Sequence, residues 1–342
     1  MKIWIDILTP KQLLFSEQII KKLEKKHKIL CTSREYEEVM ELAKIRNSDL
    51  VFVGKHGGDD KKAKLEASID RISKLFGKIK AFSPDLTISF CSPEAARISF
   101  GLRIRHVAFC DSPHADAVMR LTLPLIQKLL IPNAIPKDEF TKYGIDKKNI
   151  ISYKAIDAVV TIKRKINQEA SLPFRKNKRK NILIRVEERE ASYASKSSIT
   201  IPIIKQVVKE YSKENIVILG RYTKQIQNLQ KKFGKKAKIV KMSFDGKHLL
   251  NNTDIFIGSG GTMTAESALL GIPTISYNAV PNIIESYLVK KFLVKRETNP
   301  VKITNHIKKI FGSSNNINQK KAKRIVEQME DPIQKLIKVI KE

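Results

Sequence analysis

The fold of this chain is predicted by one stretch, Asp254-Ile-Phe-Ile-Gly-Ser-Gly-Gly-Thr-Met-Thr-Ala-Glu-Ser-Ala-Leu-Leu-Gly-Ile-Pro-Thr-Ile-Ser-Tyr277. Residues 255–257 form a short apolar run, which predicts a strand buried on both faces, as in parallel sheets. A glycine turn follows at 258–261, and a helix is predicted from about Thr262. Gly271 is placed as the C′ residue of that helix, Pro273 prevents its continuation, and residues 274–277 form the next strand.

The glycine turn predicts an anion site. Amide N–H groups at a helix start point at one spot, at the positive end of the helix dipole, and phosphate suits such a site. The predicted phosphate-binding residues are Ser259, Gly260, Gly261 and Thr262. The turn is not a P-loop, because no Gly-Lys-Ser/Thr follows, and it is not the dinucleotide fingerprint, because Met263 replaces the last glycine. An ordinary tight connection is the alternative.

Glu266 is predicted to lie in the first turn of the same helix. A capping box would need Ser or Thr three residues earlier, and that position is Met263. One interpretation is compensation of the helix dipole. The favoured interpretation is that the carboxylate accepts hydrogen bonds from a ribose diol beside the bound phosphates.

The stretch Gly258-Ser-Gly-Gly-Thr-Met-Thr-Ala-Glu266, followed by Leu269-Leu-Gly-Ile-Pro273, resembles the donor-nucleotide segment of GT-B-fold proteins. These include nucleotide-sugar glycosyltransferases and the non-hydrolysing UDP-N-acetylglucosamine 2-epimerases. More narrowly, the chain resembles an archaeal and bacterial family known only as a domain of unknown function with that fold. Further matching stretches are residues 1–7, 53–58, 111–115 and 120–124. The resemblance implies an α/β fold of two Rossmann-like domains whose parallel sheets face an interdomain cleft.

Length and composition fit that expectation. A chain of 342 residues is long enough to form two domains, and a hydrophobic content of 42% is typical of a water-soluble α/β protein. Three widely spaced cysteines without a CxxC motif predict a reduced, cytoplasmic setting. The formal charge of +30 suits phosphorylated ligands, an anionic membrane touched peripherally at its inner face, or, in second rank, nucleic acid. Dispersed solubilising charge is the plain alternative.

The first half alternates strands and helices, and ligands of such sheets gather at the carboxyl ends of the strands. The residues of these loops that we expect to contact an acceptor are Thr9, Lys11, Lys55, His56, Gly57, Gly58 and Arg120. For residues 54–60 a flexible connection is the alternative. Residues 120–132 are strongly apolar, and a helix followed by a core strand is favoured over a membrane-touching surface.

The densest chemical cluster of this half is residues 110–116. Asp111 and His114 are the predicted catalytic pair, a base with its orienting partner. A second interpretation is a set of metal ligands formed by Asp111, His114 and Asp116. No metal is expected, because a hard cation is bound by a larger number of oxygen ligands. A helix cap at Asp111 is the structural alternative.

Composition divides the chain as follows: an acceptor-side domain at 1–162, a basic linker at 163–180, a nucleotide-sugar domain at 181–312, and a terminal helix at 318–342 that packs back toward the first domain. Residues 159–162 are expected to form a short strand. The linker also permits a polyanion-binding role.

Two arginines at strand ends of the second half, Arg185 and Arg221, are predicted phosphate ligands. Arg185 matches the basic residue that often meets the diphosphate in GT-B proteins. The His-Arg-x-x-Asn segment typical of the epimerases is missing from residues 184–188, which counts against an epimerase.

The leading hypothesis is therefore glycosyl transfer from a nucleotide-sugar, most simply a UDP-sugar, with no tightly bound cofactor. The resemblance implies a glycan or lipid-linked acceptor, in cell-surface glycan or glycolipid synthesis. The alternatives are a nucleotide-sugar 2-epimerase, and a non-catalytic protein of the same fold that binds nucleic acid or an anionic surface.

Overall fold

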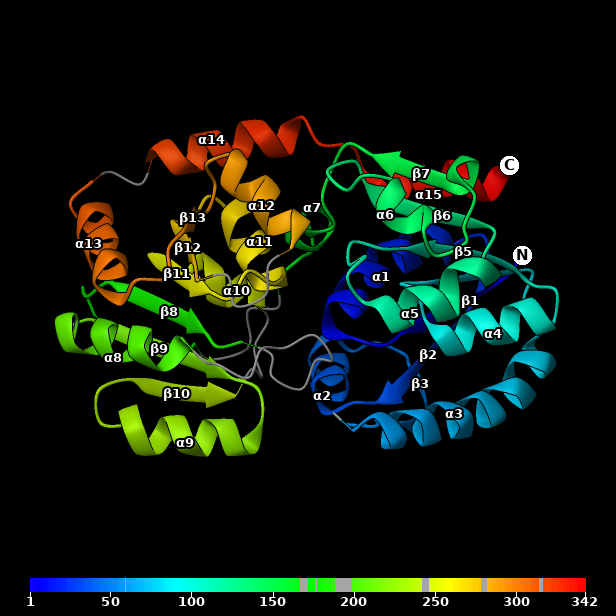
Figure 1. Ribbon diagram of the computed structural model, residues 1–342, viewed down its shortest axis with the longest axis horizontal. Coiled ribbons are helices and arrows are strands. Elements are labelled where there is room, and N and C mark those ends of the chain that lie inside the picture. Colours follow the sequence, from blue (N-terminus) through cyan, green and yellow to red (C-terminus); the bar gives the residue numbers. More distant parts are fainter. Residues whose placement is uncertain are drawn as a thin grey trace. The chain divides into compact units, whose positions relative to one another are not determined.

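The protein is seen here in a computed structural model that describes residues 1–58, 60–166, 172–175, 177–187, 199–241, 246–277, 282–313 and 316–342. The chain divides into two compact units. Unit 1 comprises Met1–Arg164 and Glu330–Glu342, and unit 2 comprises Lys165–Met329. Each unit is built on its own parallel sheet (Figure 1). Part of the predicted basic linker, residues 167–171 and 176, lies outside the described residues.

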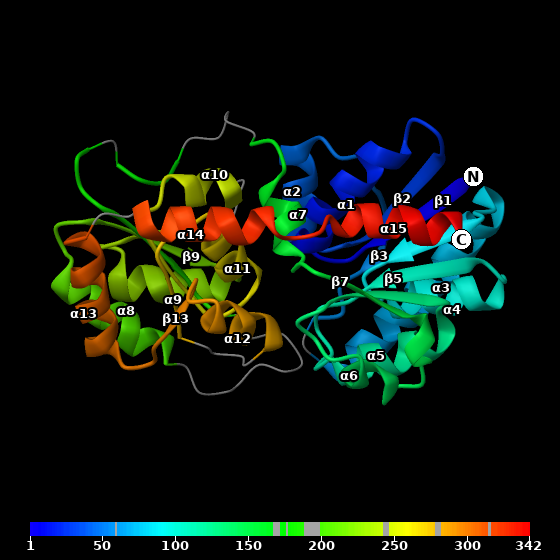
Figure 2. The same cartoon turned by 90° about the horizontal axis from the view of Figure 1, so that it is seen from above.

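Unit 1 has a seven-stranded sheet of order β3-β2-β1-β4-β5-β6-β7. Its strands are β1 (Lys2–Ile7), β2 (Lys28–Glu35), β3 (Val51–Lys55), β4 (Leu86–Ser89), β5 (Arg105–Phe109), β6 (Lys128–Pro132) and β7 (Ile150–Tyr153). Its helices are α1 (Pro10–Leu23), α2 (Glu37–Arg46), α3 (Lys61–Phe82), α4 (Pro93–Gly101), α5 (Asp116–Thr122), α6 (Asp138–Thr141), α7 (Ala158–Ile162) and α15 (Pro332–Lys341), with 3-10 turns η1 (Leu123–Leu125) and η2 (Lys147–Asn149). Helices α3, α4 and α5 cover one face of the sheet (Figure 2).

Unit 2 has a six-stranded parallel sheet of order β10-β9-β8-β11-β12-β13. Its strands are β8 (Asn181–Arg185), β9 (Asn215–Gly220), β10 (Lys238–Lys241), β11 (Ile255–Gly258), β12 (Thr274–Ser276) and β13 (Lys295–Arg296). Its helices are α8 (Thr200–Glu210), α9 (Thr223–Phe233), α10 (Gly246–Asn251), α11 (Thr262–Leu269), α12 (Ile283–Lys290), α13 (Pro300–Phe311) and α14 (Asn316–Glu327). The two parallel α/β units confirm the predicted fold class.

The strands of unit 2 are apolar on both sides because helices cover both faces of the sheet. Ile182 and Ile184 of β8 belong to a buried cluster with residues of α8, α9 and α13. Leu183, which lies between them and points the other way, belongs to a second cluster with Leu249 of α10 and Met263 of α11. This double coverage explains why the strands read as continuous apolar runs rather than as alternating patterns.

A buried ion pair joins β1 to α3 in unit 1. Arg71 Nη2 and Nη1 donate to the two carboxylate oxygens of Asp6 at 2.6 and 3.1 Å. The hydroxyls of Thr32 and Ser92 each donate to Asp6 at 2.6 Å, and Arg71 Nε donates to the Val53 carbonyl at 3.1 Å. Both charges are therefore paired and hydrogen-bonded, as burial of charge requires.

Two elements differ from the sequence-based expectation. Residues 159–162, expected as a strand, lie in helix α7, because a short buried apolar run does not distinguish a strand from a helix turn. The single helix expected over 318–342 is two helices. The chain breaks at Asp331, which caps α15, and Pro332 occupies the first helical position. Helix α14 belongs to unit 2 and α15 to unit 1.

Candidate functional site

The glycine turn of unit 2 connects β11 to α11. Gly260 is buried with a φ of 97°, which only glycine adopts freely; its N–H donates to Thr264 Oγ1 at 3.2 Å. Gly261 occupies the N-cap position and lies open, since a Cβ there would meet nothing within 4 Å. Toward the rest of the described chain, the N–H groups of Gly261, Thr262 and Met263 donate no hydrogen bond. Three donors without a partner at an open helix start suit an anion, and binding of an anion there stays a prediction.

The turn is held in place by a neighbouring helix start. Asn282 Nδ2 donates to the Gly260 carbonyl at 3.0 Å, and Asn282 also caps α12 by accepting from the Glu285 N–H at 2.7 Å. Glu285 is buried and pairs with Arg296, whose Nε donates to it at 3.0 Å. A Cβ on Gly260 would approach Glu285 Cγ to 3.3 Å. These supporting residues were not predicted, because the sequence does not show that α12 contacts the turn.

Arg185 lies at the same edge of the sheet as the turn. It ends β8, which pairs with β11, with Ile184 opposite Ile257. Arg185 is buried, and its Nη1 donates to the Gly220 carbonyl at 3.1 Å. Arg221 follows β9, one strand further from the turn. The fold thus brings Arg185 to the strand next to the turn and leaves Arg221 more distant in the sheet order.

The expected position of Glu266 in the first helical turn is wrong. Helix α11 begins at Thr262, so Glu266 is its fifth residue and lies in the second turn, where the side chain is buried. At that depth in the helix, compensation of the N-terminal dipole is weak, because the effect falls off within the first turn. A role for Glu266 in binding ribose stays a prediction.

Unit 1 contains a lysine between two carboxylates. Lys11, in the first turn of α1, contacts both Asp111, which follows β5, and Asp157, which precedes α7. The Lys11 Nζ to Asp157 Oδ2 distance is 2.7 Å, and Ser112 Oγ donates to Asp111 at 2.9 Å. The Tyr153 hydroxyl donates to Asp157. The Asp111 side chain is 22% exposed and that of Asp157 only 2%, so Asp111 is the carboxylate that a substrate can reach.

The environment shifts the pKa values of the two carboxyls in opposite directions. Burial opposes ionisation of Asp111, but the charge of Lys11 and hydrogen bonds from Lys11 and Ser112 lower its pKa below the ordinary value. For Asp157, burial raises the pKa and Lys11 only partly compensates, while the charge of Asp111 raises it further. The pKa of Lys11 is raised: the two carboxylates outweigh its burial. Two carboxyl groups whose pKa values are shifted apart in this way suit different roles in acid–base chemistry.

His114 is exposed and interacts electrostatically with Asp111; burial of its ring lowers its pKa, which Asp111 partly opposes. The pairing of Asp111 with His114 as base and partner stays a prediction. No role was predicted for Asp157 or Tyr153 from the sequence. Their one signal is position, since both lie at the carboxyl end of β7.

Three further predicted acceptor residues lie at the start of α1, in α5 and at the end of β3. Thr9 caps α1 by accepting from the Gln12 N–H at 3.4 Å. Arg120 is exposed and pairs with Asp116 at 2.9 Å. Lys55 is exposed at the end of β3. A ligand contact by any of these three stays a prediction.

The loop of His56, Gly57 and Gly58 is built by its own contacts. The His56 ring stacks on Tyr36 with centroids 4.8 Å apart, and its Nδ1 accepts from the Gly58 N–H at 3.1 Å. Burial, with nearby Arg34 and Lys64, lowers the His56 pKa to about 4, so the ring is neutral. Gly57 packs against the α3 backbone, since a Cβ there would lie 2.6 Å from Lys64 Cα. Packing thus accounts for Gly57, and the contact with a ligand stays a prediction.

The part of the chain that the structure describes contains no group of three or more His, Cys, Asp or Glu placed to hold a metal ion.

Comparison of the sequence with known protein families identifies the family of this chain. A family described as "Protein of unknown function (DUF354)" matches residues 1–342. The chain belongs to the DUF354 family. A protein of Methanocaldococcus jannaschii, described as uncharacterized protein MJ0665, is 29% identical over 318 residues, which are 91% of this chain and 92% of that protein.

Solved structures resemble this DUF354 protein over its whole length. The UDP-GlcNAc 2-epimerase of Neisseria meningitidis, bound to UDP-GlcNAc, has a TM-score of 0.75 at 18% identity, with 100% of both chains covered. Spinosyn rhamnosyltransferase SpnG has a TM-score of 0.64 at 12% identity, again with 100% of both chains covered. At such identities the likeness shows the fold alone, which is GT-B-like, as the sequence predicts.

Proposed function

We propose that this DUF354 protein binds a nucleotide-sugar through its diphosphate and transfers the sugar to an acceptor. The observation that carries the proposal is the open helix start in unit 2, where the N–H groups of Gly261, Thr262 and Met263 are free toward the described residues. Support comes from the structural relatives, since the N. meningitidis epimerase was solved with UDP-GlcNAc and SpnG with thymidine diphosphate.

In the proposed reaction the helix start and Arg185 stabilise the charge of the departing nucleoside diphosphate. Glu266 would bind the ribose. An acceptor hydroxyl attacks the anomeric carbon, the bond from that carbon to the phosphate oxygen breaks, and the hydroxyl proton passes to Asp111, which Lys11 keeps ionised. The resemblance favours a glycan or a lipid-linked saccharide as acceptor, and a UDP-sugar as donor.

One observation favours a nucleotide-sugar 2-epimerase as the second candidate. Asp111 and Asp157 share Lys11 and have pKa values shifted in opposite directions, which suits acid–base chemistry at Asp111, the more exposed of the two. Assays in heavy water distinguish the two functions. An epimerase incorporates deuterium into the sugar without any acceptor, whereas a transferase releases nucleoside diphosphate only when an acceptor is present and leaves the sugar carbons unlabelled.

The donor site is tested by the stabilisation that ligands give. We expect one of UDP, GDP, CDP, dTDP and ADP, at about 100 times its Kd, to stabilise the wild-type protein by about 2.7 kcal/mol, seen as a rise in Tm. Gly261→Ala should abolish that rise, because the new methyl group occupies the open space beside the free N–H groups. The unliganded Gly261→Ala protein should lose less than about 1 kcal/mol, since the Cβ meets nothing within 4 Å.

Gly77→Ala is the matched control. It also adds one methyl group that meets nothing within 4 Å, but in the middle of α3. It should raise the stability by about 0.5–1 kcal/mol through helix propensity and leave the nucleotide response unchanged. Nucleotide stabilisation that survives Gly261→Ala undiminished would exclude the turn as the phosphate site.

A further inference from the structure

Helix α3 has an apolar stripe that faces solvent. Leu65, Ile69 and Phe76 are 61%, 59% and 47% exposed, and their spacings of four and seven residues place them on one side of the helix. The stripe that packs into unit 1 is a different one, with Leu75 and Ile79 fully buried. The exposed stripe therefore contributes nothing to the core of the unit.

The neighbouring helices extend this apolar surface. Phe100 of α4 is 53% exposed and Leu121 of α5 is 59% exposed. On the same face of the sheet, α4 lies beside α3 and α5 lies beside α4 (Figures 1 and 2). Single exposed apolar residues are ordinary, but a set gathered on one helical layer is typical of an interaction surface.

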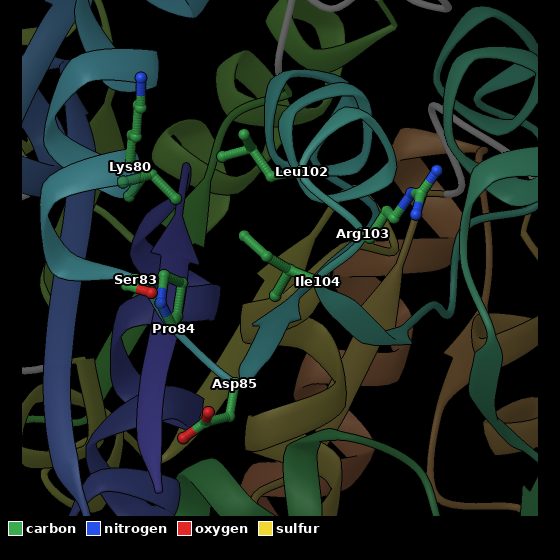
Figure 3. A pocket seen from close by; sticks show the side chains of 8 residues that line it. Lys80, Ser83, Pro84, Asp85, Leu102, Arg103 and Ile104 are labelled. Carbon is green, nitrogen blue, oxygen red and sulfur yellow. The ribbon is translucent and has the colours of Figure 1, made fainter.

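A hollow of about 430 Å³ opens between the ends of α3 and α4, and its lining includes Lys80, Ser83, Leu102 and Arg103. Figure 3 shows Lys80 on the α3 side and Arg103 on the α4 side, with Leu102 and Ile104 drawn between them. Within the described residues neither Lys80 nor Arg103 makes an ion pair. Lys80 follows Phe76 by one helical turn, so this cation lies on the same side of α3 as the exposed apolar side chains.

The same helix is strongly basic. Of its lysines, Lys62 and Lys74 lie near Glu66 and Asp70 at 3.9 and 2.8 Å. The others have no ion-pair partner among the described residues: Lys61, Lys64, Lys78 and Lys80. Lys61 lies one helical turn before Leu65, and Lys80 one turn after Phe76, so these two lysines adjoin the apolar stripe. Apolar side chains flanked by lysines match an anionic lipid surface, which takes the apolar groups into its interface and the cations at its headgroups.

We propose that the outer face of α3, with Phe100 and the adjoining hollow, docks on an anionic phospholipid bilayer. No described helix is long and apolar enough to cross a membrane, so the contact is peripheral. A second copy of the chain is a poor occupant, because two faces with the same excess of lysine repel. A nucleic acid would bind the lysines, but it would not account for the exposed leucine, isoleucine and phenylalanine side chains.

Vesicle co-sedimentation tests the proposal. The wild-type protein should sediment with vesicles of equal parts phosphatidylcholine and phosphatidylglycerol, and not with phosphatidylcholine alone. Leu65→Ser/Ile69→Ser/Phe76→Ser should weaken the partition coefficient about tenfold or more. The control Phe292→Ser/Val301→Ser/Ile317→Ser removes three exposed apolar side chains from unit 2, and should bind as wild type does.

The role of the α3 lysines is tested by comparing two triple variants that have the same net charge. Lys61→Gln/Lys62→Gln/Lys80→Gln should weaken vesicle binding about tenfold or more, whereas Lys231→Gln/Lys232→Gln/Lys235→Gln, on and after α9, should have little effect. Equal losses in both triple variants would overturn the proposal, since they would mean diffuse attraction by the net charge of +30. Two other results would also overturn it: no vesicle binding with tight binding of duplex DNA that the serine variant retains, or a dimer in sedimentation velocity that this variant dissociates.

Discussion

Arg71→Met is expected to lower the free energy of unfolding of unit 1 by about 3–5 kcal/mol, because it leaves the buried Asp6 carboxylate without its cation. The measurement is direct, since the chain has one tryptophan. Trp4 is buried in the same network, where its Nε1 donates to Thr32 Oγ1 at 2.8 Å. Tryptophan fluorescence during urea unfolding therefore reports on unit 1 alone.

Lys74→Met is the matched control on the same helix. Lys74 is exposed and pairs with Asp70 at 2.8 Å, so its loss should cost less than about 1 kcal/mol. Similar effects of the two substitutions would contradict the view that the buried pair organises the unit.

The same pair predicts an acid sensitivity. Burial would raise the pKa of Asp6, but Arg71, Ser92 and Thr32 hold it below its ordinary value of 3.8. The folded unit thus binds fewer protons than the unfolded chain in this range, so stability from Asp6 is complete above pH 3.8 and is lost as the pH falls below it. Urea midpoints measured by Trp4 fluorescence should fall steeply there, and the slope should be smaller in Asp6→Asn.

Lys11→Met is the second substitution with a large expected effect, again about 3–5 kcal/mol, because it removes the cation shared by Asp111 and the buried Asp157. Without Lys11, burial and the charge of Asp111 still raise the pKa of Asp157, and the hydrogen bond from Tyr153 is left as the counteracting cause. Its protonation then favours the folded state, so the variant should regain stability as the pH is lowered and lose it as the pH rises.

A double variant tells charge from packing. Lys11→Met/Asp157→Asn should recover much of the lost stability, since the amide has no charge to bury, but should not recover activity, because Asp111 still lacks its cation. Lys22→Met, which removes an accessible lysine of the same helix paired with Asp331 at 2.7 Å, should cost less than about 1 kcal/mol. A full loss in the double variant would instead indicate that the Lys11 chain itself is needed for packing.

Sequence reasoning worked where one local pattern decides the structure. The run before Gly258 is a strand, and Gly271 ends the following helix with a φ of 76°. Gly271 is further required by packing, because a Cβ there would lie 2.7 Å from the backbone of Gln319 in α14. That contact depends on the return of a distant helix, so only the conformational part of the role could be read from the sequence.

The unpredicted parts of the candidate sites depend on tertiary contacts. Asp157 meets Lys11 because α7 packs on α1, although their residues are far apart in sequence. Asn282 meets Gly260 because α12 begins beside the turn. Neither contact leaves a periodic signal in the chain. Helix α11 starts at Thr262, as the sequence predicts, so the misplacement of Glu266 did not come from the boundary. The fifth residue of a helix with 3.6 residues per turn lies in the second turn.

The break between α14 and α15 has a consequence for biosynthesis. Unit 2 is one uninterrupted segment, whereas unit 1 needs its last helix from the far end of the chain. Arg105 of β5 donates to the carbonyls of Val339 and Ile340 at 2.5 and 3.1 Å, and Leu336 is fully buried. A nascent chain can therefore finish the later unit before the earlier one. Strand β1 leaves the ribosome first, but unit 1 is complete only after α15 has been synthesised. Premature termination before α15 therefore leaves the apolar groove that this helix covers exposed on unit 1.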